Sequence, residues 1–131
     1  MKRTLTALIL AATTAFAAPA SAGGTITFGF TAQNADEANA IRTGLTLYQV
    51  FNDVQSNGHI SQNGLNNLAA LGQSGSGHVG IIHQDGNNHE GSIGQSGSNN
   101  SCGLFQFGNG ASGHVNQSGN GEACLVFQAG F

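Results

Sequence analysis

Positive charge is nearly absent from this sequence. Only three of its 131 residues are Lys or Arg (Lys2, Arg3 and Arg42), against six Asp or Glu residues. Nucleic-acid binding draws most of its affinity from Lys and Arg side chains that neutralise phosphates, and binding to anionic lipid depends on the same residues. The composition therefore predicts a protein that binds neither nucleic acid nor an anionic membrane surface.

Motifs for catalysis and for cofactor binding are also missing. There is no nucleophile elbow or phosphate loop, and Asp85, Glu90 and Glu122 stand apart rather than in pairs. A zinc ion needs three or four converging ligands, and the spacing of the histidines does not supply them. These histidines are His59, His78, His83, His89 and His114. We expect no enzymatic activity, no catalytic residues, no cofactor and no metal site.

Long hydrophobic runs are absent except for one near the start. Lys2 and Arg3 precede an apolar stretch over 5–16, and Ala20-Ser21-Ala22 has the small residues of a cleavage site. These parts are typical of a secretory signal peptide, and the apolar stretch is shorter than the ~20 residues that a spanning helix needs. We predict a signal peptide over 1–22 and a secreted mature chain that does not insert into a membrane.

Proline, threonine and methionine are missing from residue 58 onward, where 17 residues are glycine. Such a composition resembles a disordered linker, but it contains a regular repeat. The triplet Gln-x-Gly occurs seven times at intervals of 11 residues, with an aliphatic residue two positions before each Gln and a small residue two positions earlier. This alternation has a period of two, which predicts a β-strand in every unit.

Each position of the repeat forms a column of seven residues. The glutamines are Gln62, Gln73, Gln84, Gln95, Gln106, Gln117 and Gln128. The aliphatic residues are Ile60, Leu71, Ile82, Ile93, Leu104, Val115 and Val126. The glycines are Gly64, Gly75, Gly86, Gly97, Gly108, Gly119 and Gly130. We expect the first two columns to point inward and the glycines to support turns.

An 11-residue period can also belong to a helical coil. Each Gly would destabilise such a helix by about 1 kcal/mol relative to Ala, so helix is excluded for 58–131. Each unit is predicted to be a strand of about seven residues followed by a turn. Two all-β arrangements remain, a meander of hairpins and a flattened two-sheet β-solenoid with 22 residues per rung.

We favour the solenoid because it explains why Gln recurs inward in every unit. Residues 22 apart in the sequence would then stack about 4.8 Å apart, and each Gln amide would bond the next one. Each such bond contributes on the order of 1 kcal/mol. One sheet would hold the first, third, fifth and seventh glutamines, and the facing sheet the other three.

The repeat resembles the curlin repeats of curli, the amyloid fibres of bacterial surfaces. The segments 62–73 and 95–106 share the skeleton Gln-x-Gly-x-x-Asn-x-x-x-Leu-x-Gln, and the resemblance covers 58–131. It implies a structural subunit that self-assembles into an extracellular cell-surface fibre for adhesion, aggregation and biofilm formation. The implied partners are further copies of the chain, other curlin-like subunits and an outer-membrane export machinery.

The column five residues after each Gln departs from the curlin pattern of inward Asn. Asn67 and Asn100 keep it, whereas other units have His78, His89, Ala111 or Glu122. This departure raises the alternative that, within the family, the chain is a nucleating or minor subunit rather than the major subunit. The alternative function is a monomeric or oligomeric secreted β-solenoid that acts as a surface adhesin.

The segment 23–57 lies before the repeats and does not match them. Alternation over Thr25–Phe30 predicts a short strand. Asn34, with Glu37 three residues later, is typical of a helix start and predicts an amphipathic helix over 35–52. This helix is either a packing element or, as the resemblance implies, an export-targeting segment.

Alternation along the strands also predicts an apolar outer face on one sheet. Its residues are Val79, Ile81, Phe105, Phe107, Leu125 and Phe127, whereas the other sheet turns mainly Ser outward. A contiguous apolar patch marks an interface. We expect the amphipathic segment or a neighbouring filament to cover it.

Two further expectations concern the later repeats. Cys102 and Cys124 are 22 residues apart and would face inward in adjacent rungs, either as a disulfide or as two small residues. His78, Asn100 and Glu122 would form a hydrogen-bonded polar column. We also expect no capping element after the last unit, which would leave both ends of the solenoid open to strand addition by another copy.

Overall fold

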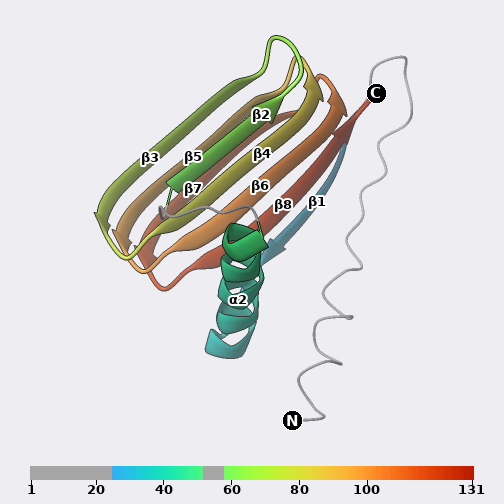
Figure 1. The fold of residues 1–131 in the computed structure, drawn as a ribbon. Coiled ribbons are helices and arrows are strands. Elements are labelled where there is room, and N and C mark those ends of the chain that lie inside the picture. Colours follow the sequence, from blue (N-terminus) through green and yellow to red (C-terminus); the bar gives the residue numbers. More distant parts are fainter. Residues whose placement is uncertain (1–24, 52–57) are drawn as a thin grey trace.

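The structure is a computed structural model that describes residues 25–51 and 58–131 (Figure 1). The predicted signal peptide lies outside the described residues. In chain order the elements are β1 (Thr25–Thr31), α2 (Ala35–Phe51), β2 (Gly58–Asn63), β3 (Leu68–Ser76), β4 (Val79–Asn87), β5 (Glu90–Ser98), β6 (Ser101–Asn109), β7 (Ser112–Asn120) and β8 (Ala123–Gly130).

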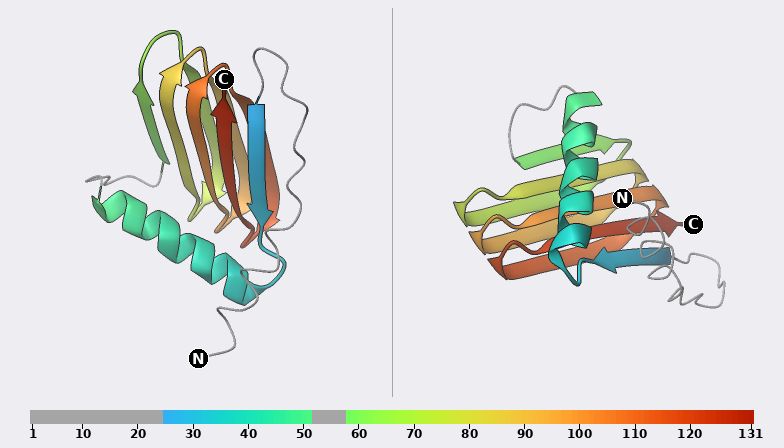
Figure 2. Two further views of the ribbon diagram at one scale, coloured as in Figure 1. Left: turned by 90° about the vertical axis from the view of Figure 1, so that its right-hand side faces the viewer. Right: turned by 90° about the horizontal axis from the view of Figure 1, so that it is seen from below.

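The repeat strands wind into a flattened β-solenoid of two facing sheets (Figures 1 and 2). One sheet has the order β1-β8-β6-β4-β2, and the other has the order β3-β5-β7. All neighbouring repeat strands are parallel, and the register sets Gln84 opposite Gln106 and Gln95 opposite Gln117. A meander would have antiparallel neighbours, so the predicted β-solenoid is confirmed.

Five of the repeat strands, β3 to β7, have nine residues, which is longer than the sequence predicts. The parallel pairing does not stop at the glycine of the Gln-x-Gly triplet. Gly86 still pairs with Gly108, and Asn87 with Asn109. The turns between strands are correspondingly short.

The space between the two sheets holds an apolar core. Ile82, Ile93 and Leu104 are fully buried there, and Cys102 and Cys124 pack against them. Burial of one such aliphatic side chain stabilises the fold by about 1.5–3 kcal/mol.

Helix α2 begins directly after Asn34, whose Oδ1 accepts a hydrogen bond from the backbone N–H of Glu37 (2.9 Å). This bond is the cap that the sequence predicts. The helix lies across the outer face of the five-stranded sheet (Figure 2). Ala38, Ile41 and Leu45 are buried there. No helix of the described residues is long and apolar enough to span a membrane.

The expectation that the last repeat has no cap is wrong. Strand β1 pairs antiparallel with β8, with Thr27 opposite Gln128, and the N–H of Ala32 donates to the carbonyl oxygen of Ala123 (2.9 Å). The N-terminal strand therefore covers the edge of β8. At the other end of the solenoid, within the described residues, the outer edges of β2 and β3 carry no further strand.

Candidate functional site

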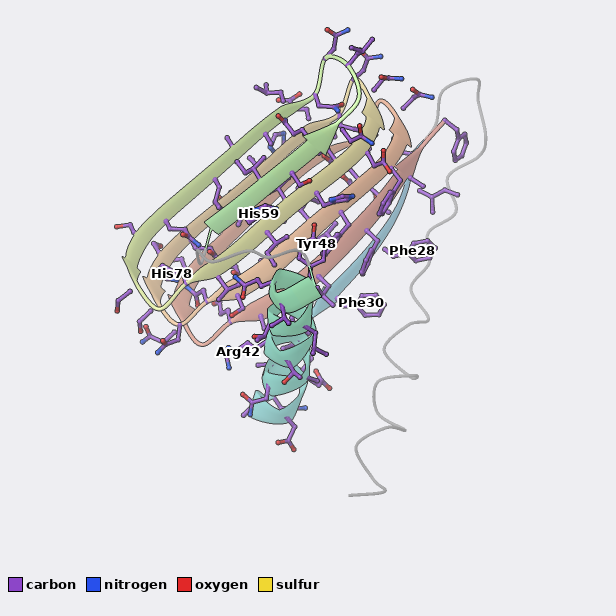
Figure 3. All side chains as sticks on the ribbon, in the orientation of Figure 1. Phe28, Phe30, Arg42, Tyr48, His59 and His78 are labelled. Carbon is purple, nitrogen blue, oxygen red and sulfur yellow. A yellow bond between two sulfur atoms is a disulfide. The ribbon has the colours of Figure 1, made fainter. Side chains whose placement is uncertain are left out.

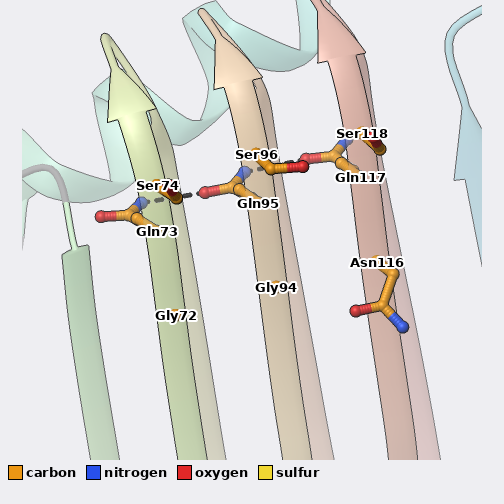
Figure 4. Close-up of a pocket in the computed structure, with 9 residues that line it drawn as sticks. All are labelled: Gly72, Gln73, Ser74, Gly94, Gln95, Ser96, Asn116, Gln117 and Ser118. Atoms are coloured by element: carbon orange, nitrogen blue, oxygen red, sulfur yellow. Dashed lines mark hydrogen bonds between the residues drawn. The ribbon is translucent and has the colours of Figure 1, made fainter.

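The glutamines of the repeat form two continuous ladders of amide hydrogen bonds. In the five-stranded sheet, Nε2 of Gln84 donates to Oε1 of Gln106 (2.7 Å), and Gln106 donates likewise to Gln128 (2.7 Å). In the three-stranded sheet, Gln73 donates to Gln95 and Gln95 to Gln117, each at 2.8 Å (Figure 4). Each amide except the last of its ladder thus donates to the copy 22 residues later.

Each inner glutamine also bonds the facing sheet, which the sequence did not indicate. Nε2 of Gln84 donates to the carbonyl oxygen of Leu68 (2.9 Å), and Nε2 of Gln106 donates to that of Glu90 (2.8 Å). Gln95, Gln117 and Gln128 bond a carbonyl 16 residues earlier in the same way. The described residues contain no buried side-chain nitrogen or oxygen without a partner. The ladders therefore join neighbouring rungs and facing sheets at once.

Burial along the predicted columns depends on the position of the rung. The inner members Gln84, Gln106, Ile82 and Leu104 are fully buried. In the first rung, by contrast, Gln62 and Gln73 are exposed, and Ile60 is 40% exposed. Leu71, Val115 and Val126 are half-buried. The first rung therefore presents to solvent side chains that are interior elsewhere.

Six of the seven repeat glycines have positive φ and follow the inward Gln closely. They are Gly64, Gly75, Gly86, Gly97, Gly108 and Gly119. A Cβ on Gly86 would collide with the carbonyl oxygen of Gly108 in the next rung. Five of these glycines, all except Gly119, are required by close backbone stacking as much as by the turn. Gly130, opposite Thr25 of β1, is the exception and does not have a positive φ.

His78 and Asn100 lie in the turns between strands, which we call the corners of the rungs, and both make hydrogen bonds to the backbone there. Asn100 Oδ1 accepts the N–H of Glu122 (3.0 Å), and its Nδ2 donates to the carbonyl oxygen of Ser96 (2.8 Å). His78 Nδ1 accepts the N–H of Asn100 (3.3 Å), and its Nε2 donates to the carbonyl oxygen of Ser74 (2.9 Å). An imidazole thus offers an acceptor and a donor in place of an amide.

The same arrangement holds for two further members of this column. His89 Nδ1 accepts the N–H of Ala111 (3.1 Å), and Asn67 Oδ1 accepts the N–H of His89 (3.1 Å). The histidines therefore keep the corner pattern although they depart from the curlin Asn. The column of His78, Asn100 and Glu122 is joined by bonds from the backbone N–H of one residue to the side chain of the residue before it in the column. Ala111 has no polar side-chain atom that could make this bond. Glu122 is exposed at the end of the column.

Of the two alternatives for the cysteines, the structure has the disulfide. Cys102 and Cys124 lie opposite each other in β6 and β8, with their Cα atoms 4.6 Å apart. Both are buried in the core. The bond covalently links the last two rungs of the five-stranded sheet.

The outer apolar face that the sequence predicts lies partly beneath α2. Ile81 and Phe105 are buried against the helix, and Val79 and Leu125 are half-buried beside them. Phe107 and Phe127 remain 40% and 37% exposed. The amphipathic segment therefore covers the centre of this face but not its far side.

Tyr48 contributes the aromatic part of the helix contact. Its ring packs edge-on against Phe105, with centroids 5.4 Å apart, and its hydroxyl lies 3.1 Å from Nδ1 of His83. Burial raises the pKa of Tyr48.

Arg42 anchors α2 to the turns of the solenoid, a role that the sequence did not reveal (Figure 3). One of its terminal nitrogens donates to the carbonyl oxygens of Asn99 (3.0 Å) and Gly121 (2.7 Å), which are 22 residues apart in successive rungs. Its isolation as the single basic residue of the sequence after Arg3 was the available signal.

No cluster of His, Cys, Asp or Glu that could hold a metal ion occurs in 25–51 and 58–131. No known protein family, curated protein or solved structure matches the chain. Its chemistry must therefore be inferred from the ladders and the strand edges.

Proposed function

We propose that this chain is a structural subunit of an extracellular amyloid fibre of the curli type, built by stacking copies end to end. The observation that carries the proposal is the pair of in-register glutamine ladders, Gln62 to Gln128 and Gln73 to Gln117. Stacked, parallel, identical side chains with satisfied amides are the interior of cross-β fibres. In the fibre, the 11-residue strand-and-turn unit is the repeating element, and two units make one rung.

The first rung supplies the surface onto which another copy adds. The outer edges of β2 and β3 carry no further strand within the described residues, and Gln62 and Gln73 are exposed there. An uncovered strand edge recruits a strand of another chain through backbone hydrogen bonds. The low charge of the repeats reduces repulsion between stacked copies. Such a fibre would support adhesion and biofilm formation after export through an outer-membrane machinery.

Within the fibre we assign the chain to a nucleating or minor position. Its corner column loses the Asn amide at Ala111, which has no polar side-chain atom, and at Glu122, whose carboxylate can accept an N–H but cannot donate to a carbonyl as Asn100 and His78 do. A subunit with an incomplete column is better suited to starting a stack than to forming its bulk.

A second function, a secreted adhesin that stays monomeric or forms small oligomers, is favoured by one observation. Strand β1 covers the edge of β8, and repeat proteins that remain soluble usually carry such caps. In this alternative the exposed faces of the solenoid, rather than its ends, would contact the surface ligand.

Incubation of the purified mature chain, residues 23–131, separates the two functions. A fibre subunit gives seedable, concentration-dependent thioflavin fluorescence and diffraction spacings of about 4.8 Å and 10 Å. Persistent monomer at all concentrations and with added seeds would instead favour the adhesin.

A charged first rung supplies the matched test. The double variant Gln62→Lys, Gln73→Lys changes two exposed side chains, so we expect it to keep the monomer fold and to lose elongation. The variant Ser74→Lys places one such charge on the outer face of β3 and should still elongate. Elongation of the double variant at the wild-type rate would contradict assembly through this rung.

A further inference from the structure

We propose that β1 is a removable cap that holds the chain in a polymerisation-incompetent state until a second copy displaces it from β8. This inference rests on the proposed fibre function. Strand β1 occupies the edge of β8 along its full length, from Thr25 opposite Gly130 to Thr31 opposite Cys124. The first rung of an incoming copy needs the same edge to extend the five-stranded sheet.

The inward side of β1 imitates a repeat strand only in part. Nε2 of Gln128 donates to the hydroxyl oxygen of Thr27 (3.2 Å), so a threonine takes the place of the next glutamine. The side chain of Thr27 is too short to continue the ladder of amide hydrogen bonds. A repeat strand of a second copy would present a glutamine at this position and would extend the row of amides.

The aliphatic column also ends at β1. Gly29 lies opposite Val126, and a Cβ built on Gly29 would meet no atom within 4 Å. Val126 consequently remains half-buried although its equivalents in inner rungs are fully buried. A leucine or isoleucine of an incoming strand would fill this space, so exchange of β1 for a repeat strand increases buried apolar surface.

The attachment of α2 explains why β1 nevertheless holds its place. Only Ala32 to Asn34 separate β1 from the helix, which is fixed to the solenoid by Leu45 and Arg42. This tether keeps β1 at a high effective concentration beside β8. Release of β1 does not require release of α2, because Leu45 packs against the sheet and Arg42 bonds the turns. Phe28 and Phe30 project from the outer side of β1 (Figure 3).

A reversible lock tests the proposal. In the double variant Ile26→Cys, Ala129→Cys the new side chains lie opposite each other on the outer face, away from the buried Cys102–Cys124 bond. We expect the oxidised variant to show no elongation from wild-type seeds over the period in which the reduced variant elongates at the wild-type rate. The single variant Ile26→Cys, taken through the same treatment, reports any effect of the reductant on the native disulfide.

A pair of proline variants tests the cap by weakening the attachment of β1 to β8. The bond from Ala32 to Ala123 sets the alternation of the antiparallel pair, so the N–H of Phe28 faces β8 and that of Gly29 faces away. Phe28→Pro removes a bonded donor together with the phenyl ring, and should shorten the lag at least ~fivefold, which is the effect of the lost hydrogen bond alone. Gly29→Pro introduces the same ring without that loss and should not shorten the lag.

The results of these experiments distinguish failure of the cap proposal from failure of the proposed fibre function. Equal elongation of the oxidised and reduced forms would overturn the cap and leave the fibre function standing. Absence of fibres from the wild type, Phe28→Pro and a chain lacking 25–31 would overturn both. Fibres from Phe28→Pro or the shortened chain but not from the oxidised double variant would support both.

Discussion

The two sheets of the solenoid share one interior but have different outer faces. Inside, both carry the same column of glutamines and the same column of aliphatic residues. Outside, the five-stranded sheet presents Ile81 and Phe105 to α2, whereas the three-stranded sheet presents Ser74, Ser96 and Ser118 (Figure 4). The repeat therefore constrains the side chains that stack between the sheets, and the outer positions vary and decide what each face contacts.

Removal of an aromatic ring from beneath the helix should have the largest effect. Phe105→Ser deletes a ring that is 8% exposed and packed against Tyr48. We expect the free energy of unfolding to fall by about 3–5 kcal/mol, measured by chemical denaturation of the monomer. Phe107→Ser, on the same strand but 40% exposed, is the control and should cost less than about 1 kcal/mol. Equal losses would mean that α2 does not cover this face in solution.

Loss of the helix anchor should have an intermediate effect. Arg42→Gln removes the charged donor that bonds the carbonyl oxygens of Asn99 and Gly121. A hydrogen bond from a charged group contributes about 1.5–3 kcal/mol, so we expect a loss in that range and faster amide hydrogen exchange in α2. Unchanged exchange in α2 would contradict the anchoring role. Arg42→Lys keeps the charge and should restore part of the protection.

A substitution on the uncovered sheet should have the smallest effect. Ser96 is exposed on the outer face of β5, and Ser96→Ala should change the free energy of unfolding by no more than about 0.5 kcal/mol. Thermal denaturation of the monomer measures it. A loss above about 1 kcal/mol would show that this face is packed in solution, and the contrast between the sheets would then fail.

The solenoid could be predicted because its information is local and repeated. A slip of one residue in any unit would have turned its glutamine outward, so seven units in step specify the register of the stack. The helix start was equally readable, since Asn34 and Glu37 form a cap within four residues.

Contacts between distant, unrepeated segments could not be predicted in this way. The partner of β1 lies about 100 residues away, as the bond between Thr27 and Gln128 shows, and Thr25–Thr31 lacks the Gln-x-Gly triplet of the repeat units. The corner role of His78 depends on which ring nitrogen meets which backbone group, a geometry that residue spacing does not contain.

Because the side-chain amide bonds of both ladders all point the same way, the solenoid has an electric dipole along its axis. In both ladders the N–H groups point toward the later rungs and the carbonyls toward the earlier ones, from Gln62 to Gln128 and from Gln73 to Gln117. Aligned amide dipoles add along an axis, as they do in an α-helix, and leave partial charges of opposite sign at the two extremities. Two solenoids that met at ends of the same partial charge would repel each other. A growing filament built from this chain is therefore expected to be polar, with two chemically distinct tips.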